Sequence, residues 1–71
     1  MIQGTVEWFD ADGGRGCIRT DEGESLFVHR RDVEADSRTL ASGQRVRLDR
    51  LETSAGPRAA HVHPVQGGPK G

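Results

Sequence analysis

Hydrophobic and polar side chains alternate along several short segments of this chain, and glycines separate the segments. Val, Ile, Phe, Trp and Thr are frequent within them, and no segment keeps a helical period, which is typical of β-strands. The pattern predicts strands at residues 3–10, 15–20, 25–29, 45–52 and 58–64. Residues 21–24 form a tight hairpin in this prediction, because Asp-Glu-Gly has the chemistry of a turn.

The longest connection covers residues 30–44. One helical turn is expected at residues 31–35, and Leu40 is expected to point inward. Residues 66–71 contain glycine and proline with nothing to pack, so we expect a flexible tail after a single domain at residues 1–65.

Because side chains alternate across a strand, each predicted strand divides into two faces. One face is aliphatic and could fill the interior of a small barrel: Val6, Ile18, Leu26, Val28, Val46, Leu48 and Val62. The opposite face leaves Phe27 and His29 outside, and a large aromatic side chain on a polar face is informative. In the last strand the alternation places Ala60 inside and Ala59 outside.

The first strand does not fit a regular alternation. Val6 and Trp8 have the same parity, yet one belongs to the aliphatic set and the other to the aromatic set. A bulge or sharp bend at residues 7–9 would resolve the conflict, and such bends let small barrels turn corners. The pattern as a whole therefore predicts an all-β protein, a small five-stranded antiparallel barrel.

Composition limits the classes of function. The chain has 71 residues, 30% of them charged, and a net charge of −1, so a nucleic-acid partner would need a local basic patch. No apolar run approaches the roughly 20 residues that span a bilayer, and no secretory signal is visible, so we expect no membrane association. A lone cysteine, Cys17, excludes an internal disulfide and fits a reducing, cytoplasmic location. We expect a monomer.

Four motifs occur in order along the chain: GTVEWFDADGGRGCI at residues 4–18, LFVHR at 26–30, TLASGQRV at 39–46 and GPRAAHV at 56–62. Together they resemble the bacterial cold-shock protein family. The resemblance implies an OB-type barrel whose second and third strands carry aromatic side chains for unstacked bases. It also implies binding of single-stranded RNA or DNA, as in RNA chaperones and regulators of transcription or translation.

The resemblance carries over unevenly. Trp8, Phe27 and His29 match the family's stacking residues, and Phe9 matches a packing position. Three aromatic positions differ, because Arg15, Cys17 and Arg30 stand where the family has phenylalanine. An arginine stacks on bases and pairs with phosphate, whereas Cys17 replaces little of the lost stacking.

We therefore expect a weaker and more salt-dependent binder than an aromatic-rich relative. The residues expected to bind nucleic acid are Trp8, Arg15, Cys17, Phe27, His29, Arg30 and Arg31.

Other functions have weaker support. His61 and His63 share a strand face, but nothing in the spacing brings a third metal ligand to them. The glycines at residues 13–16 lack the Lys-Ser/Thr of a phosphate loop, and no catalytic partner accompanies the acidic residues. We expect no enzyme, no cofactor and no small-molecule substrate. The alternative is a diverged OB-type module that binds a protein or acts only within a larger nucleoprotein complex.

Overall fold

The computed structural model describes residues 2–34 and 38–65. Its strands are β1 (Ile2–Asp10), β2 (Arg15–Thr20), β3 (Ser25–His29), β4 (Arg45–Thr53) and β5 (Gly56–Pro64). A short 3-10 helix, η1 (Arg30–Asp32), follows β3. The helical turn expected at residues 31–35 is therefore shorter and begins one residue earlier, because Val33 already pairs with β5; residue 35 lies outside the described residues. The expected tail at residues 66–71 lies outside the described residues.

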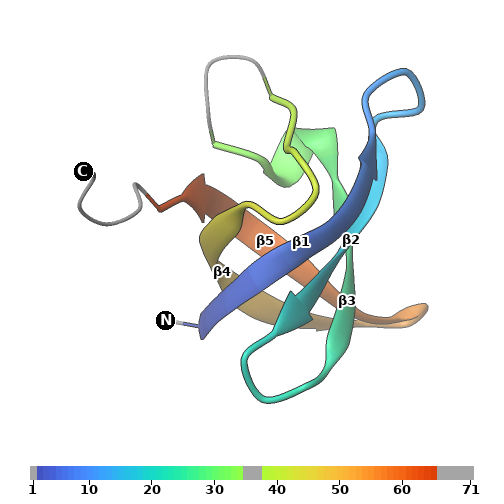
Figure 1. Cartoon of the computed structure of the whole chain (residues 1–71). Helices are drawn as coiled ribbons and strands as arrows, with labels where there is room; N and C mark the ends of the chain where they lie inside the picture. Colours follow the sequence, from blue (N-terminus) through green and yellow to red (C-terminus); the bar gives the residue numbers. More distant parts are fainter. Residues whose placement is uncertain (1, 35–37, 66–71) are drawn as a thin grey trace.

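The strands curl into a closed barrel in the order β1-β2-β3-β5-β4 (Figure 1). Adjacent strands are antiparallel except where β3 meets β5, which is a parallel pairing of Phe27 with Arg58. The predicted all-β, five-stranded barrel of the OB type is confirmed. Within residues 2–34 and 38–65, no helix is long and apolar enough to cross a membrane.

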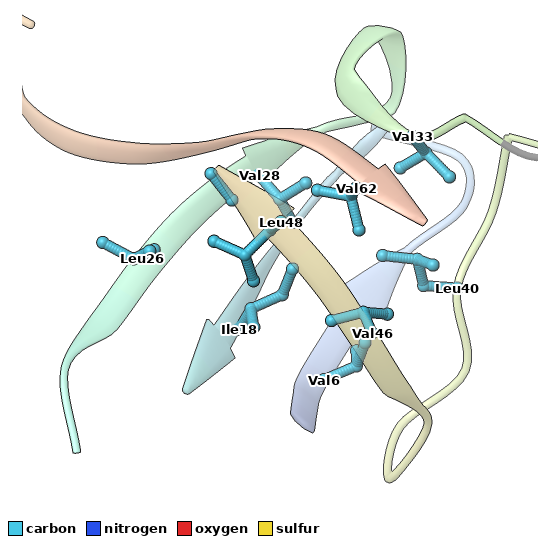
Figure 2. Packing of buried hydrophobic residues seen from close by; sticks show 10 residues of the cluster. Val6, Ile18, Leu26, Val28, Val33, Leu40, Val46, Leu48 and Val62 are labelled. Carbon is cyan, nitrogen blue, oxygen red and sulfur yellow. The ribbon is translucent and has the colours of Figure 1, made fainter. Parts of the chain in front are cut away.

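The interior is aliphatic, and side chains from separate strands converge in it (Figure 2). All seven residues predicted to face inward are 0–1% exposed. Leu40 is buried as expected, and Val33 joins the core from the segment after η1, where it bridges to Val62 in β5. The long connection therefore contributes to the core as well as linking β3 to β4.

The bulge expected in β1 is present. Val6 pairs with Ile18 and Trp8 pairs with Cys17, so the pairing moves by two residues along β1 but by only one along β2. Glu7 is the extra residue. It lets Val6 be buried while Trp8 is exposed, and it turns Phe9 back toward the core. A regular strand would have sent Val6 and Trp8 to the same face.

The alternation predicted for β5 is wrong at Ala59. This residue was expected outside, but it is fully buried and belongs to the core. The reason is a second irregularity, where Asp49 pairs with Ala60 but Arg47 pairs with His63. His61 is the residue with left-handed backbone there, with φ of 50°, and it interrupts the period of two.

Candidate nucleic-acid interface

Three residues form a row across the outer surface of neighbouring strands. Trp8 of β1 pairs with Cys17 of β2, and Cys17 pairs with Phe27 of β3. Trp8 is 45% exposed and Phe27 is 56% exposed, although both belong to strands whose other face is buried. We call Trp8, Cys17 and Phe27 the stacking row. Neighbouring strands lie about 4.8 Å apart, so the small Cys17 leaves open space between two aromatic side chains.

Gly16 allows β1 and β2 to approach closely beneath this row. A Cβ atom at Gly16 would meet the carbonyl oxygen of Trp8, and it would lie 2.9 Å from the Cα of Phe9. Because these neighbours are backbone atoms, any larger residue would force the strands apart. Glycine at this position therefore keeps Trp8 in register with Cys17.

His29 lies at the end of β3 and pairs across the sheet with Arg15, the first residue of β2. Its Nδ1 accepts a hydrogen bond of 3.2 Å from the backbone N–H of Arg31, which makes His29 the N-cap of η1. This bond fixes the ring and leaves Nε2 as the edge that can reach a ligand. The sequence prediction of Phe27 and His29 as neighbours on one outer face agrees with this arrangement.

Three arginines lie at the same end of the sheet as His29, and we call Arg15, Arg30 and Arg31 the arginine cluster. None of the three forms an ion pair with another described residue. Arg30 is held over the β1–β2 turn, because its backbone N–H donates to the carbonyl of Gly14 at 2.8 Å. Its side chain covers Gly14, where a Cβ atom would lie 3.0 Å from Nε. The cluster therefore presents three cations that no described carboxylate holds in an ion pair.

Arg19 differs from these arginines because it is already paired. Its Nε donates to Glu7 Oε2 at 2.9 Å, and its Nη1 donates to the carbonyl oxygen of Gly23 at 3.4 Å. The hydrogen bond from Arg19 holds the pKa of Glu7 below its ordinary value, with a smaller contribution from Cys17. Glu7 is therefore an anion at neutral pH, beside the stacking row.

Cys17 is partly buried, and its thiol lies 3.4 Å from Glu7 Oε1. Burial raises the pKa of the Cys17 thiol, and the hydrogen bond to the Glu7 carboxylate raises it further. The thiol is therefore protonated at neutral pH, so Cys17 is a small neutral side chain in the middle of the stacking row.

Sequence reasoning missed Arg58. The parallel pairing of β3 with β5 places it directly beside Phe27, and a local alternation rule gives no sign of such a long-range pairing. Two open hollows flank Phe27 here. Arg58 lines both of them. The first, of about 200 Å³, is also lined by His29 and Arg31. The second, of about 410 Å³, is also lined by Pro57.

Asp32 holds Arg58 at the edge of these hollows. Arg58 Nη2 lies 3.5 Å from Asp32 Oδ1, and the Asp32 side chain is only 11% exposed. Arg58 Nε and Asp32 Oδ2 are both buried and have no hydrogen-bond partner among residues 2–34 and 38–65. The contact is long and leaves these two buried atoms unsatisfied, while the rest of the Arg58 side chain, 40% exposed overall, is open to a ligand in the hollows.

The structure thus gathers the predicted residues on one surface, that of β1, β2 and β3 and the start of η1. Trp8, Cys17 and Phe27 form its row, His29 and Arg15 extend it, and Arg30 and Arg31 follow at the same end. This surface combines exposed rings with cations that form no ion pair in the described part of the chain. Such a combination suits a ligand with flat faces and a negatively charged backbone.

Comparison with known proteins agrees with this geometry. Residues 2–65 match the family described as the 'Cold-shock' DNA-binding domain. Cold shock protein 1 of Lactiplantibacillus plantarum is 43% identical over 65 residues, which cover 90% of this chain and 98% of the relative. A cold shock-like protein of Thermotoga maritima is 42% identical over 66 residues, covering 92% of this chain and 100% of the relative.

The major cold shock protein of Streptococcus pyogenes is 40% identical over 63 residues, which cover 87% of this chain and 94% of the relative. The match to the family extends over all five strands of the barrel and includes every residue of the candidate interface. This chain belongs to the cold-shock domain family.

Proposed function

We propose that this protein binds single-stranded RNA or DNA on the outer surface of β1, β2 and β3. Unstacked bases lie against Trp8, Phe27 and His29, and the arginine cluster contacts phosphates or bases. The observation that carries the proposal is the pair of exposed aromatic rings in the stacking row, beside three arginines that form no ion pair with any described residue.

Stacking supplies affinity without requiring a particular base. Each base stacked on an aromatic side chain contributes about 1–3 kcal/mol by alanine substitution, because every base has a π-face. Trp8 and Phe27 provide two such positions, and the ring of His29 a third. Cys17 between them contributes little stacking, so we infer a weaker affinity than that of a relative with an aromatic residue there.

The arginines supply the charge that the whole molecule lacks. Net charge is −1, yet much of the acidic charge near the interface is compensated locally. Glu7 pairs with Arg19, Asp21 with Arg45 and Glu24 with Arg50, while Arg15, Arg30 and Arg31 stay unpaired among the described residues. Asp10 and Asp12 around the β1–β2 turn oppose the arginine cluster, but its three arginines outnumber them, so we infer a small local excess of positive charge on this surface.

Binding of this kind would hold RNA in an unpaired state. We propose a role as an RNA chaperone or as a regulator of transcription or translation, acting as a cytoplasmic monomer without catalysis. Such roles need many weak and reversible contacts, and binding based on stacking and charge supplies them.

Fluorescence of Trp8 tests the proposal directly, because Trp8 is the single tryptophan of the chain. A short pyrimidine-rich single strand, titrated at low salt, should quench the emission with a dissociation constant in the range of roughly 1–100 µM. A duplex of the same sequence is the control and should bind more weakly, because its bases are not free to stack. If neither strand changes the emission nor comigrates with the protein, single-strand binding is wrong, and the interpretation as a protein-binding module gains support.

A further inference from the structure

Glu7 occupies an unusual position for a carboxylate in a surface that binds nucleic acid. It is the extra residue of the β1 bulge, so its side chain lies on the outer face together with that of its neighbour Trp8. Its carboxylate accepts hydrogen bonds from Arg19 and Cys17, two of the three residues that point outward from β2. The carboxylate is thus fixed at the edge of the stacking row, on the side of Cys17 opposite to Arg15.

The two oxygens of Glu7 are not equivalent. Oε2 accepts a strong, charge-assisted hydrogen bond of 2.9 Å from Arg19, whereas the one described partner of Oε1 is the Cys17 thiol at 3.4 Å. A thiol is a weak donor, so Oε1 keeps most of its capacity to accept a hydrogen bond. Because Arg19 is also bound to the Gly23 carbonyl, it orients the carboxylate without blocking Oε1.

The distribution of charge gives a bound strand a preferred placement. Glu7 and Arg19 neutralise each other, so their end of β2 attracts phosphate less than the arginine cluster at the other end does. A bound nucleic-acid strand would therefore place its backbone near the arginine cluster and the edges of its bases toward Glu7. Cys17 is small, lies between the two rings in the sheet and contacts Oε1, so a base stacked on Trp8 or Phe27 would extend its edge over Cys17 toward this acceptor.

We propose that Glu7 makes this interface selective for bases with an exocyclic amino group, so that cytosine is preferred over uracil or thymine. Cytosine presents an amino donor at its 4-position, which a carboxylate accepts. Uracil and thymine present a carbonyl oxygen there, which faces the carboxylate unfavourably. This selectivity rests on the proposed single-strand binding and adds a specificity-determining residue to it.

Oligocytidylate and oligouridylate of equal length are the probes, titrated against Trp8 fluorescence at about pH 8, where both bases and Glu7 keep one protonation state. Oligocytidylate should bind roughly tenfold more tightly than oligouridylate, the size of one good hydrogen bond to a base edge. Glu7→Gln keeps the shape of the side chain but offers an amide N–H to the uracil carbonyl. The preference should therefore fall to about twofold or less.

Glu24→Gln is the matched control. It also removes one carboxylate that is paired with an arginine, but Glu24 lies in the β2–β3 turn and bonds to Arg50. This variant should bind both probes slightly more tightly and keep the preference for oligocytidylate. Equal binding of the two probes by the unmodified protein, or a preference that survives Glu7→Gln, would overturn the role of Glu7. Failure of both probes to bind would instead overturn the proposed single-strand binding itself.

Discussion

Phe27 presents its ring to solvent although its neighbours Leu26 and Val28 are fully buried. Nothing in the core requires this ring, so Phe27→Ala should leave folding intact and act on binding. We expect the affinity for a single strand to fall by about 1–3 kcal/mol, or roughly 5- to 150-fold. His63→Ala is the control on β5 and should change the affinity less than twofold, within the usual range of about 0.5 kcal/mol for surface changes. Similar losses in both variants would mean that the binding surface lies elsewhere.

Arg31 should act through charge, and a salt series separates charge from stacking. For single strands the slope of log K against log salt concentration is about −0.7 for each neutralised phosphate. Arg31→Ala should make the slope shallower by about this amount. Arg47→Ala removes the same charge from β4, which carries no part of the stacking row, and should leave the slope unchanged. Equal slopes for the protein and Arg31→Ala would show that Arg31 meets no phosphate.

Single residues differ in how far the sequence predicts them. Phe27 and His29 follow from alternation alone, because the strand around them is regular. Trp8 needed the additional step of a bulge. Arg58 was out of reach, since its place beside Phe27 depends on how the barrel closes. The pairing of Glu7 with Arg19 was missed for a similar reason, because the bulge brings together side chains that strand parity alone does not relate.

At the scale of elements, β2 and β3 have the bounds that the sequence predicts, and β4 and β5 extend slightly beyond them. The irregularity in β5 was not predictable, because Ala59 and Ala60 are both small and give no contrast in hydrophobicity. In β1, by contrast, Val6 is aliphatic and Trp8 is aromatic, so their shared parity showed that a regular strand could not place both correctly. Sequence patterns therefore reveal a bulge only where the side chains around it differ in kind.

The connection after η1 is fastened to β5 by Glu34. Its backbone N–H donates to the Val62 carbonyl at 2.7 Å, and its side chain meets two histidines. His61 Nδ1 lies 2.9 Å from Oε2, and His63 Nε2 lies 3.8 Å from Oε1. The hydrogen bond with Glu34 raises the pKa of His61, and Asp49 and Asp32 add to it; the same bond lowers the pKa of Glu34.

These shifts predict how stability depends on pH. A raised pKa of His61 stabilises the fold fully below the ordinary value of 6.5, and this stabilisation is lost as pH rises through the raised pKa. Because the pKa of Glu34 is lowered, its carboxylate stabilises the fold fully above the ordinary pKa of 4.5. This stabilisation is lost as pH falls through the lowered pKa. The contact is therefore strongest between about 4.5 and 6.5.

Thermal unfolding of Glu34→Gln measures this contribution. Its melting temperature should fall below that of the unmodified protein at about pH 5.5, and the difference should shrink at about pH 8. Glu22→Gln, which removes an exposed carboxylate from the β2–β3 turn, should show no such pH-dependent difference. A Glu34→Gln difference that stays constant with pH would show that His61 does not contribute through its charge.

The whole molecule has a thin core and little stability to spare. For 71 residues a free energy of unfolding of roughly 4–10 kcal/mol is typical. Leu48 is fully buried in β4, so Leu48→Ala should cost about 2–5 kcal/mol in chemical denaturation. Leu51 on the same strand is 43% exposed, and Leu51→Ala should cost about 0.5 kcal/mol or less. Comparable losses at the two positions would contradict the burial described for β4.

The parallel pairing that closes the barrel also bears on the order of folding. The stacking row is built within the first three strands, whose antiparallel pairings join neighbours in the chain, whereas closure must bring Arg58 to Phe27. Contacts between distant residues carry the larger entropic cost of loop closure and limit the rate. We therefore expect the antiparallel sheet of β1, β2 and β3 to form before the pairing of β3 with β5 closes the barrel. In pulse-labelling hydrogen exchange, amides of β2 should gain protection before those of β5, and simultaneous protection would contradict this order. The surface for nucleic acid would then exist, in outline, before the protein is fully folded.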